Sequence, residues 1–323
     1  MLTIVMYHYV RDPDRSRFPD MNVRTPAEFE GQLDYVERHY EPVRLADVRA
    51  AHAGEGDLPE HACLLTFDDG VADHRDVVLP ALVGRGIPGC FAPSAQAVLE
   101  RRVLDVQKSQ FVLAAEPDHG LVLERVLAAL EPYAVTRPEL AAETVCADEA
   151  DDRFDDRVTT LVKGLFQHAL PEDVRRPVLD RLFAELVTDD EHAFAEELYL
   201  SLDDVRTLRQ EGMEIAGHGV AHRHLGLVDR AVQLEEIAGT RAFLTLVTGA
   251  EPEGWTMCYP SGSFDETTLE LLDAAGCALG MTVEPGLADP VGAALTLPRL
   301  DTNDLPVRGD AAPVSWTTAA VGT

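Results

Sequence analysis

The sequence is poor in positive charge, and above all in lysine. Lys108 and Lys163 are the only lysines, and 27 basic residues stand against 57 acidic ones, which gives a net charge of −30. A chain this acidic repels the phosphates of nucleic acids and the headgroups of anionic membranes. We therefore expect neither a nucleic acid nor a membrane as a partner.

Closely spaced cysteine pairs are also missing. No two of the five cysteines form a CxxC motif, and their odd number and wide spacing predict reduced, mostly buried thiols. These cysteines are Cys63, Cys90, Cys146, Cys258 and Cys277. Long apolar runs are absent, and the first ten residues lack a basic segment. We expect no membrane span, no cleaved signal peptide and a cytoplasmic location.

What the sequence does contain is an alternation of short apolar runs with helical patterns. Strands are expected at 2–9, 62–67, 89–92, 213–216, 255–259, 278–283 and 297–300. Helices are expected at 26–39, 45–53, 73–85, 229–247 and 264–275. In the helix at 229–247, one face is expected to hold Leu234, Ile237, Ala238 and Leu244. This alternation predicts an α/β fold with a parallel sheet.

The alternation stops in the middle of the chain. Residues 101–200 have an almost purely helical pattern divided by prolines, which predicts a helical insertion between two parts of one α/β domain, 1–100 and 201–305. From 306 to 323 the composition turns to small residues, so we expect a flexible tail there.

Two adjacent carboxylates, Asp68 and Asp69, end the apolar run at 62–67 and are followed by Gly70. Neighbouring carboxylates repel each other unless a metal ion or a cationic side chain offsets their charge. By itself, an Asp-Asp-Gly sequence is also a common turn.

A second polar motif follows another predicted strand, with His218 and His222 four residues apart. Two imidazoles and one carboxylate leave coordination positions open, which is typical of catalytic zinc sites and also describes non-haem iron sites. The carboxylate pair can then divide its work, with one aspartate as a metal ligand and the other as a general base. In a chain with eleven histidines, an isolated HxxxH spacing also arises by chance.

The two motifs together, TFDDG and GHxxxH, resemble the polysaccharide deacetylase family, which is carbohydrate esterase family 4 with the NodB homology domain. The resemblance covers roughly residues 1–100 and 200–305. It implies a distorted (β/α) barrel and a metal-dependent hydrolase of N-acetyl groups on amino sugars, most often with Zn²⁺. By resemblance, Asp69, His218 and His222 correspond to the metal ligands and Asp68 to the general base.

The third motif of the family is altered. Many members have an arginine before a Pro-Tyr-Gly turn, whereas this chain has Cys258, Tyr259, Pro260 and Ser261. Tyr259 and Ser261 are candidates for contacting substrate, and the backbone N–H of Ser261 can donate to an oxyanion. Arg299 is either a replacement for the missing arginine beside Asp68 or a surface residue at a strand end.

His8 lies in a Tyr-His pair that is similar to the N-terminal motif of the branch deacetylating poly-N-acetylglucosamine. By that resemblance His8 is the general acid, and imidazolium can protonate a leaving amine. The alternative is a histidine packed in the core.

The resulting hypothesis is a metal-dependent deacetylase acting on an acetylated sugar. Alternatives are a deformylase, an O-deacetylase or another amide hydrolase on a small intracellular substrate, and a non-catalytic protein that binds metal and sugar. The insertion at 101–200 is expected to act as a lid over the site or as a contact within a homo-oligomer.

Overall fold

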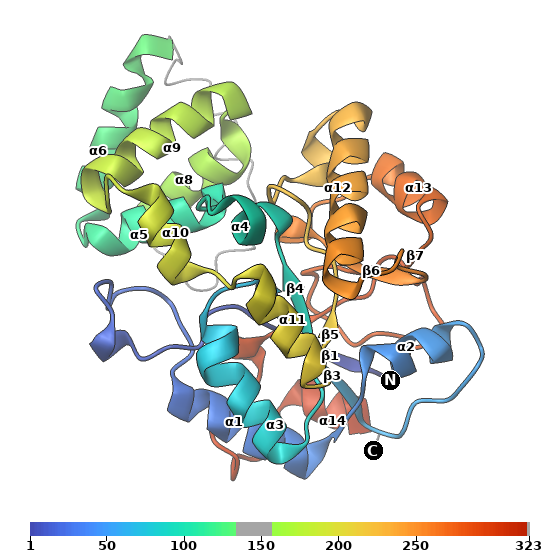
Figure 1. The fold of residues 1–323 in the computed structure, drawn as a ribbon. Coiled ribbons are helices and arrows are strands. Elements are labelled where there is room, and N and C mark those ends of the chain that lie inside the picture. Colours follow the sequence, from blue (N-terminus) through green and yellow to red (C-terminus); the bar gives the residue numbers. More distant parts are fainter. Residues whose placement is uncertain (134–156, 322–323) are drawn as a thin grey trace. The chain divides into compact units, whose positions relative to one another are not determined.

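Parallel strands are the framework of the fold in a computed structural model that describes residues 1–133 and 157–321 (Figure 1). The strands are β1 (Thr3–Tyr7), β2 (Glu41–Pro42), β3 (Ala62–Asp69), β4 (Cys90–Pro93), β5 (Glu214–Ile215), β6 (Trp255–Cys258), β7 (Cys277–Met281) and β8 (Leu300–Asp301). Six of them form one sheet in which β5, β4, β3, β1 and β8 follow one another and β2 pairs with β3. Strands β6 and β7 form a separate parallel pair.

Single-residue bridges join this pair to the larger sheet on both sides. Gly217, just after β5, bridges to Met257 in β6, and Met281 at the end of β7 bridges to Leu297, just before β8. Because β8 also pairs with β1, the strands close into an all-parallel ring. Closure through isolated bridges distorts the ring, so the predicted fold class, a distorted (β/α) barrel, is confirmed.

Helices surround the strands of this barrel. They are α1 (Pro26–His39), α2 (Leu45–His52), α3 (Leu79–Arg85), α4 (Ala95–Glu100), α11 (Leu202–Gln210), α12 (Arg230–Thr248), α13 (Glu266–Ala274) and α14 (Ser315–Val321). A π-helical turn at His74–Val78 precedes α3. The start of α1 follows from its sequence, because Thr25 and Glu28 form a reciprocal capping box. On its inner side α1 buries Phe29, Leu33 and Val36.

Side-chain alternation along β1 and β3 builds a core on each face of the sheet. Val5, Leu65 and Phe67 belong to one buried cluster with residues of the surrounding helices. Ile4 and Leu64 belong to the other, which is continued by residues of β4, β6 and β7. In a parallel barrel the carboxyl ends of the strands meet at one edge, and Asp68 and Asp69 end β3 there.

The chain folds into two compact units, each with most of its contacts within itself. The barrel is formed by residues 1–12, 23–101 and 196–323, and the second unit by 13–22 and 102–195. The helices of the second unit are α5 (Asp105–Ala115), α6 (His119–Leu130), α8 (Arg157–Gly164), α9 (Glu172–Leu186) and α10 (Glu191–Leu198, whose end belongs to the barrel unit). The stretch 134–156, with Cys146, lies outside the described residues. The role of this unit as a lid or oligomer contact stays a prediction.

The second unit has its own core. Phe18, from the loop after β1, packs its ring against Phe111 and Phe194. Lys108 is buried, and its ammonium group pairs with Asp180 and Glu191. The unit therefore includes a segment from the N-terminal part of the chain, which the sequence did not indicate.

Two local expectations differ from the structure. Residues after 306 were expected to be a flexible tail, whereas Thr317 in α14 is buried and its hydroxyl lies 2.8 Å from the hydroxyls of both Tyr35 and Tyr40. The expected apolar face of α12 is also shifted, because Leu234 is 53% exposed while Glu236 is buried. In both places small or polar side chains are buried because they have hydrogen-bond partners.

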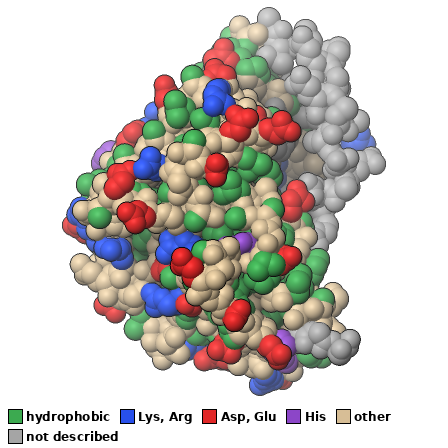
Figure 2. Space-filling view, turned by 90° about the vertical axis from the view of Figure 1, so that its right-hand side faces the viewer, with side chains coloured by type: hydrophobic (Ala, Val, Ile, Leu, Met, Phe, Trp, Pro, Cys, Tyr) green, Lys and Arg blue, Asp and Glu red, His purple; other side chains and the backbone are tan. Residues whose placement is uncertain are grey.

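Acidic side chains on the face shown in Figure 2 are scattered among basic and apolar ones. No helix in the two described ranges is both long enough and apolar enough to cross a membrane.

Candidate active site

Asp69 is held in an unusual backbone conformation at the end of β3. Its φ is 72°, and Gly70 follows with a φ of 77°. A Cβ atom at Gly70 would lie 2.5 Å from the Cβ of Pro93, so only glycine fits there. Regular alternation would put Asp68 and Asp69 on opposite faces, and the left-handed backbone at Asp69 changes that direction. This conformation is strained for a residue other than glycine, and such strain is often found at functional sites.

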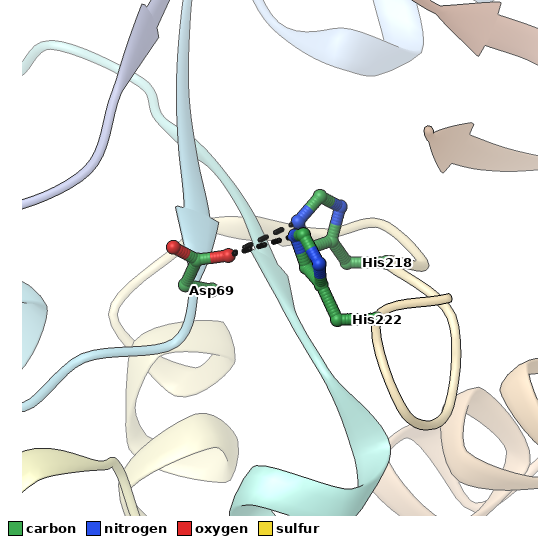
Figure 3. A group of neighbouring side chains, drawn as sticks. All are labelled: Asp69, His218 and His222. Atoms are coloured by element: carbon green, nitrogen blue, oxygen red, sulfur yellow. Dashed lines mark hydrogen bonds and ion pairs between the residues drawn. The ribbon is translucent and has the colours of Figure 1, made fainter. Parts of the chain in front are cut away.

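His218 and His222 lie in the loop after β5 and point toward Asp69 (Figure 3). The Nε2 atoms of His218 and His222 are 3.2 Å and 3.5 Å from Oδ1 of Asp69. One ligand atom from each of the three residues lies within 4.8 Å of the other two. The structure thus brings together the three residues that the sequence analysis named as metal ligands, although 149 positions separate Asp69 from His218.

The protonation of these residues fits a metal site. Nδ1 of His218 lies 2.9 Å from the carbonyl oxygen of Cys258, which only accepts, so Nδ1 carries a proton and Nε2 is the atom left to bind a metal ion. Nε2 faces a carboxylate oxygen, so a proton or a metal ion must lie between the two atoms. Burial lowers the pKa of His222 to about 4, which keeps this ring neutral and able to bind a metal at neutral pH.

The electrostatic effects at Asp69 and His218 are mutual. Burial alone would raise the pKa of Asp69, but the hydrogen bond with His218 and the charges of nearby histidines lower it below its ordinary value. Burial alone would lower the pKa of His218, but the carboxylates of Asp68 and Asp69 raise it. Without a metal ion, a proton therefore compensates the carboxylates at this position.

Asp68 is paired with Arg299. Nη1 of Arg299 donates to Oδ1 of Asp68 at 3.1 Å, and Nη2 lies 2.8 Å from Oδ2. Both side chains are buried, and Arg299 also donates to the carbonyl of Thr282 and the hydroxyl of Thr66. Burial alone would raise the pKa of Asp68, but Arg299, together with the nearby His218 and His8, lowers it below its ordinary value. Arg299 is thus no surface residue; it lies beside Asp68, where the sequence analysis expected a replacement for the arginine missing from the third motif.

His8 directly follows β1 and is half-buried. His8 lies within electrostatic range of Asp68, Asp69 and His222. Two side chains from the segment that follows β3 hold the backbone around His8. Nε2 of His74 lies 2.9 Å from the carbonyl oxygen of His8, and Asp73 accepts from the N–H of Val10. Neither Asp73 nor His74 was identified from the sequence.

The turn after β6 contributes less than its sequence suggested. Tyr259 is fully buried, its hydroxyl donates to the carbonyl of Leu295 at 2.8 Å, and its ring stacks on Phe264. The expectation that its side chain contacts substrate therefore does not fit the structure. Ser261 is exposed and has a φ of 52°, so it remains the candidate of this turn.

Strained backbone is concentrated in this region. Within the described parts of the chain, the non-glycine residues with positive φ are His61, Asp69, Arg101, His222 and Ser261. Three of them, Asp69, His222 and Ser261, are candidate site residues. Strain at this frequency indicates that the surrounding structure holds the site in a defined shape.

Comparison with known proteins gives one family. Residues 187–280 match the family model described as polysaccharide deacetylase. The poly-beta-1,6-N-acetyl-D-glucosamine N-deacetylase of Escherichia coli K12 is 40% identical over 90 residues, which make up 28% of this chain and 13% of that protein. The chain thus matches only a small part of the length of its curated relative. The range 187–280 contains His218 and His222, whereas Asp68 and Asp69 lie outside it.

Solved structures of other proteins match this chain over a longer range than the family model does. IcaB from Ammonifex degensii matches with a TM-score of 0.58 and 18% identity, covering 99% of this chain and 95% of that one. The Streptococcus pyogenes deacetylase PplD, solved in complex with acetate, matches with a TM-score of 0.56 and 16% identity, covering 93% and 91%. At these identities the likeness establishes the fold. The predicted resemblance to the polysaccharide deacetylase family is therefore confirmed by sequence for residues 187–280, and the fold of these solved structures is shared over most of the chain.

Proposed function

We propose that this chain is a metal-dependent hydrolase that removes the acetyl group from an N-acetylated amino sugar. One observation carries the proposal: three metal-ligating atoms lie within 4.8 Å of each other, and the residue next to Asp69 in the chain is a buried carboxylate paired with Arg299. The name of the Escherichia coli relative, a poly-N-acetylglucosamine deacetylase, supports the same chemistry. The resemblance of the Tyr7-His8 pair to that branch points in the same direction.

Asp69, His218 and His222 would hold the metal ion. Two imidazoles and one carboxylate suit Zn²⁺ and leave room for water and substrate. When bound, such an ion supplies a Lewis acid that polarises the acetyl carbonyl and lowers the pKa of a water molecule.

Asp68 is the proton acceptor in the proposed reaction. Its lowered pKa keeps it ionised, and Arg299 fixes the orientation of its carboxylate. As water attacks the carbonyl carbon, Asp68 takes up one of its protons. The N–H of Ser261 is the proposed donor to the carbonyl oxygen as that atom becomes negative. His8 gives a proton to the nitrogen while the C–N bond breaks, so the products are acetate and a free amine.

Metal removal tests the proposal directly. After treatment with a chelator and its removal, the protein should release no acetate from β-1,6-linked N-acetylglucosamine oligomers, and Zn²⁺ should restore release. Acetate is measured enzymatically, and a sample carried through the same exchanges without chelator is the control.

The outcomes of that assay separate the alternatives. Release of formate from formylated substrates instead of acetate would identify a deformylase, and preference for acetyl esters an O-deacetylase. Undiminished activity in metal-free protein would contradict the metal-dependent mechanism. A metal-loaded protein that hydrolyses none of these substrates would favour a non-catalytic binding protein.

His8→Gln tests the proton donor. We expect kcat on N-acetylated sugar to fall by about a hundredfold, because the amine leaves poorly without a proton. Hydrolysis of an activated aryl acetate should change only a few-fold, since a phenolate leaves unprotonated. His52→Gln, in the last turn of α2, is the matched control and should alter neither rate. Equal losses on both substrates would exclude His8 as the acid.

A further inference from the structure

The loop that holds the two histidines has no regular secondary structure of its own. Gly219 and His222 both have left-handed backbone, with φ of 71° and 54°. For a histidine this conformation costs energy, and the loop adopts it only if its surroundings impose it. His218 is fixed separately. Its Nδ1 is hydrogen-bonded to the carbonyl of Cys258, and both the N–H and the carbonyl of the preceding Gly217 are hydrogen-bonded to β6. What fixes His222 must therefore act on residues 219–222.

A buried carboxylate occupies the inside of this loop. Glu236, from α12, is 3% exposed. Its Oε2 accepts from the N–H of Val220 at 2.7 Å and from the N–H of Ala221 at 3.1 Å. Successive N–H groups that converge on one anionic oxygen form a nest, which stabilises left-handed turns of this kind. A Cβ at Gly219 would lie 3.1 Å from the same oxygen, so the loop has closed tightly around the carboxylate.

The carbonyl groups of the same loop are held from the opposite side. The N–H groups of Ala95 and Gln96, at the start of α4, donate to the carbonyls of Gly219 and Val220 at 3.2 Å and 2.9 Å. The hydroxyl of Ser94 donates to Val220 as well, at 2.7 Å. The loop is thus held between α4 and α12. Glu236 supplies the negative charge in this arrangement, and its Oε1 also lies 3.9 Å from Nε of Arg223, the residue after His222.

We propose that Glu236 is a positioning residue that sets the place of His222 through the loop backbone and so determines metal affinity. The inference rests on the proposed function, since it assumes that Asp69, His218 and His222 bind a metal ion. Glu236 bonds to the two residues immediately before His222, so a shift of their N–H groups moves the imidazole. The other two ligands have supports of their own in β3 and β6. Loss of Glu236 should therefore release one ligand of three.

The test compares Glu236→Gln with Glu235→Gln, which changes an exposed neighbour on the same helix. Glutamine keeps the size of the side chain, and its oxygen can still accept from both N–H groups. It removes the negative charge, so both hydrogen bonds become weaker. Titration of the metal-free proteins with Zn²⁺, followed by calorimetry, should give a Kd about ten- to a hundredfold weaker for Glu236→Gln. Glu235→Gln should stay within about twofold of the parent, as expected for an exposed side chain. Visible spectra of the Co²⁺ forms should show altered coordination only for Glu236→Gln.

Thermal unfolding of the metal-free proteins distinguishes positioning from general support of the fold. A Glu236→Gln variant that unfolds at a lower temperature yet binds Zn²⁺ with the parent's Kd would overturn the inference while leaving the proposed function intact. A parent protein that binds no Zn²⁺ would instead refute the proposed function itself, and the inference with it.

A second variant covers the case in which Glu236→Gln does not fold. Ser94→Ala removes one hydroxyl donor from the other side of the loop. Because a single hydrogen bond is lost, we expect the Kd for Zn²⁺ to become about fivefold weaker. Weaker Zn²⁺ binding by Ser94→Ala supports the view that this loop controls affinity, and an unchanged Kd contradicts it.

Discussion

Asp68→Asn should lower kcat for amide hydrolysis by about a thousandfold, because the amide side chain cannot take up the proton of the attacking water. Asparagine has the same shape, and it leaves Asp69, the proposed metal ligand, in place. The bound metal should therefore remain at one ion per chain. Unlike His8→Gln, this variant should lose activity on aryl acetates as well, since both substrates need the activated water.

This prediction is tested by measuring the hydrolysis rates and the metal content of the purified variant at a temperature where it is folded. Asp76→Asn changes an exposed carboxylate a few residues further along the chain and serves as the control. A fully active Asp68→Asn protein would exclude Asp68 as the base. An inactive protein that has lost its metal would instead mean that Asp68 belongs to the ligand set.

Arg299→Leu should be the most destabilising single change at the site. It leaves Asp68 as a charged carboxylate buried without its partner, and removing one member of a buried pair costs roughly 3–5 kcal/mol. Since whole domains are stable by only about 5–15 kcal/mol, this is a large part of the free energy of unfolding. The pKa of Asp68 should rise at the same time, because only the nearby His218 and His8 then oppose the effect of burial.

Denaturant unfolding of three variants checks this. Arg308→Leu removes an arginine from an exposed pair with Asp310 and should change little. The double replacement Asp68→Leu with Arg299→Leu should recover much of the stability, because no buried charge remains. If Arg299→Leu is as stable as the parent, the pair does not carry the charge balance of the core.

The pH dependence of this stability has a defined sign. The pKa of Asp68 is lower in the folded protein than its ordinary value near 4. The pair therefore stabilises the fold fully above that ordinary value, and its contribution is lost as the pH falls through the lowered pKa. In Arg299→Leu this acid-side loss should be smaller, because the largest of the groups that lower the pKa of Asp68 has been removed.

Much of the barrel could be predicted because its elements have local signals. The capping box at Thr25 sets the start of α1, and α3 ends at Arg85 as expected, because Gly86 follows with a φ of 69°. The strands ending at Asp69 and Ile215 follow from short apolar runs. Since parallel strands share one carboxyl edge, polar residues just after such runs were expected to meet.

The supports of the site could not be predicted in the same way. Glu236 is an acidic residue in an amphipathic helix, and its burial depends on a loop whose shape no local pattern encodes. Tyr259 appeared available for substrate because it lies in a family motif, yet its hydroxyl has a partner at Leu295. Thr317 is small and polar, and only contact with two tyrosines reveals why its segment is ordered. Each depends on contacts between distant parts of the chain.

The pair of Asp68 and Arg299 also constrains the order in which the protein can mature. The two residues are 231 positions apart, and Arg299 lies in the segment that closes the barrel. While a ribosome is still making the chain, the strand ending at Asp69 exists long before the guanidinium that balances its charge. Burying a carboxylate without a partner is costly in free energy. Until Arg299 is available, the Asp68 side chain must therefore stay hydrated or take up a proton. Dehydration of the barrel interior is therefore a late event, completed only after residue 299 has emerged.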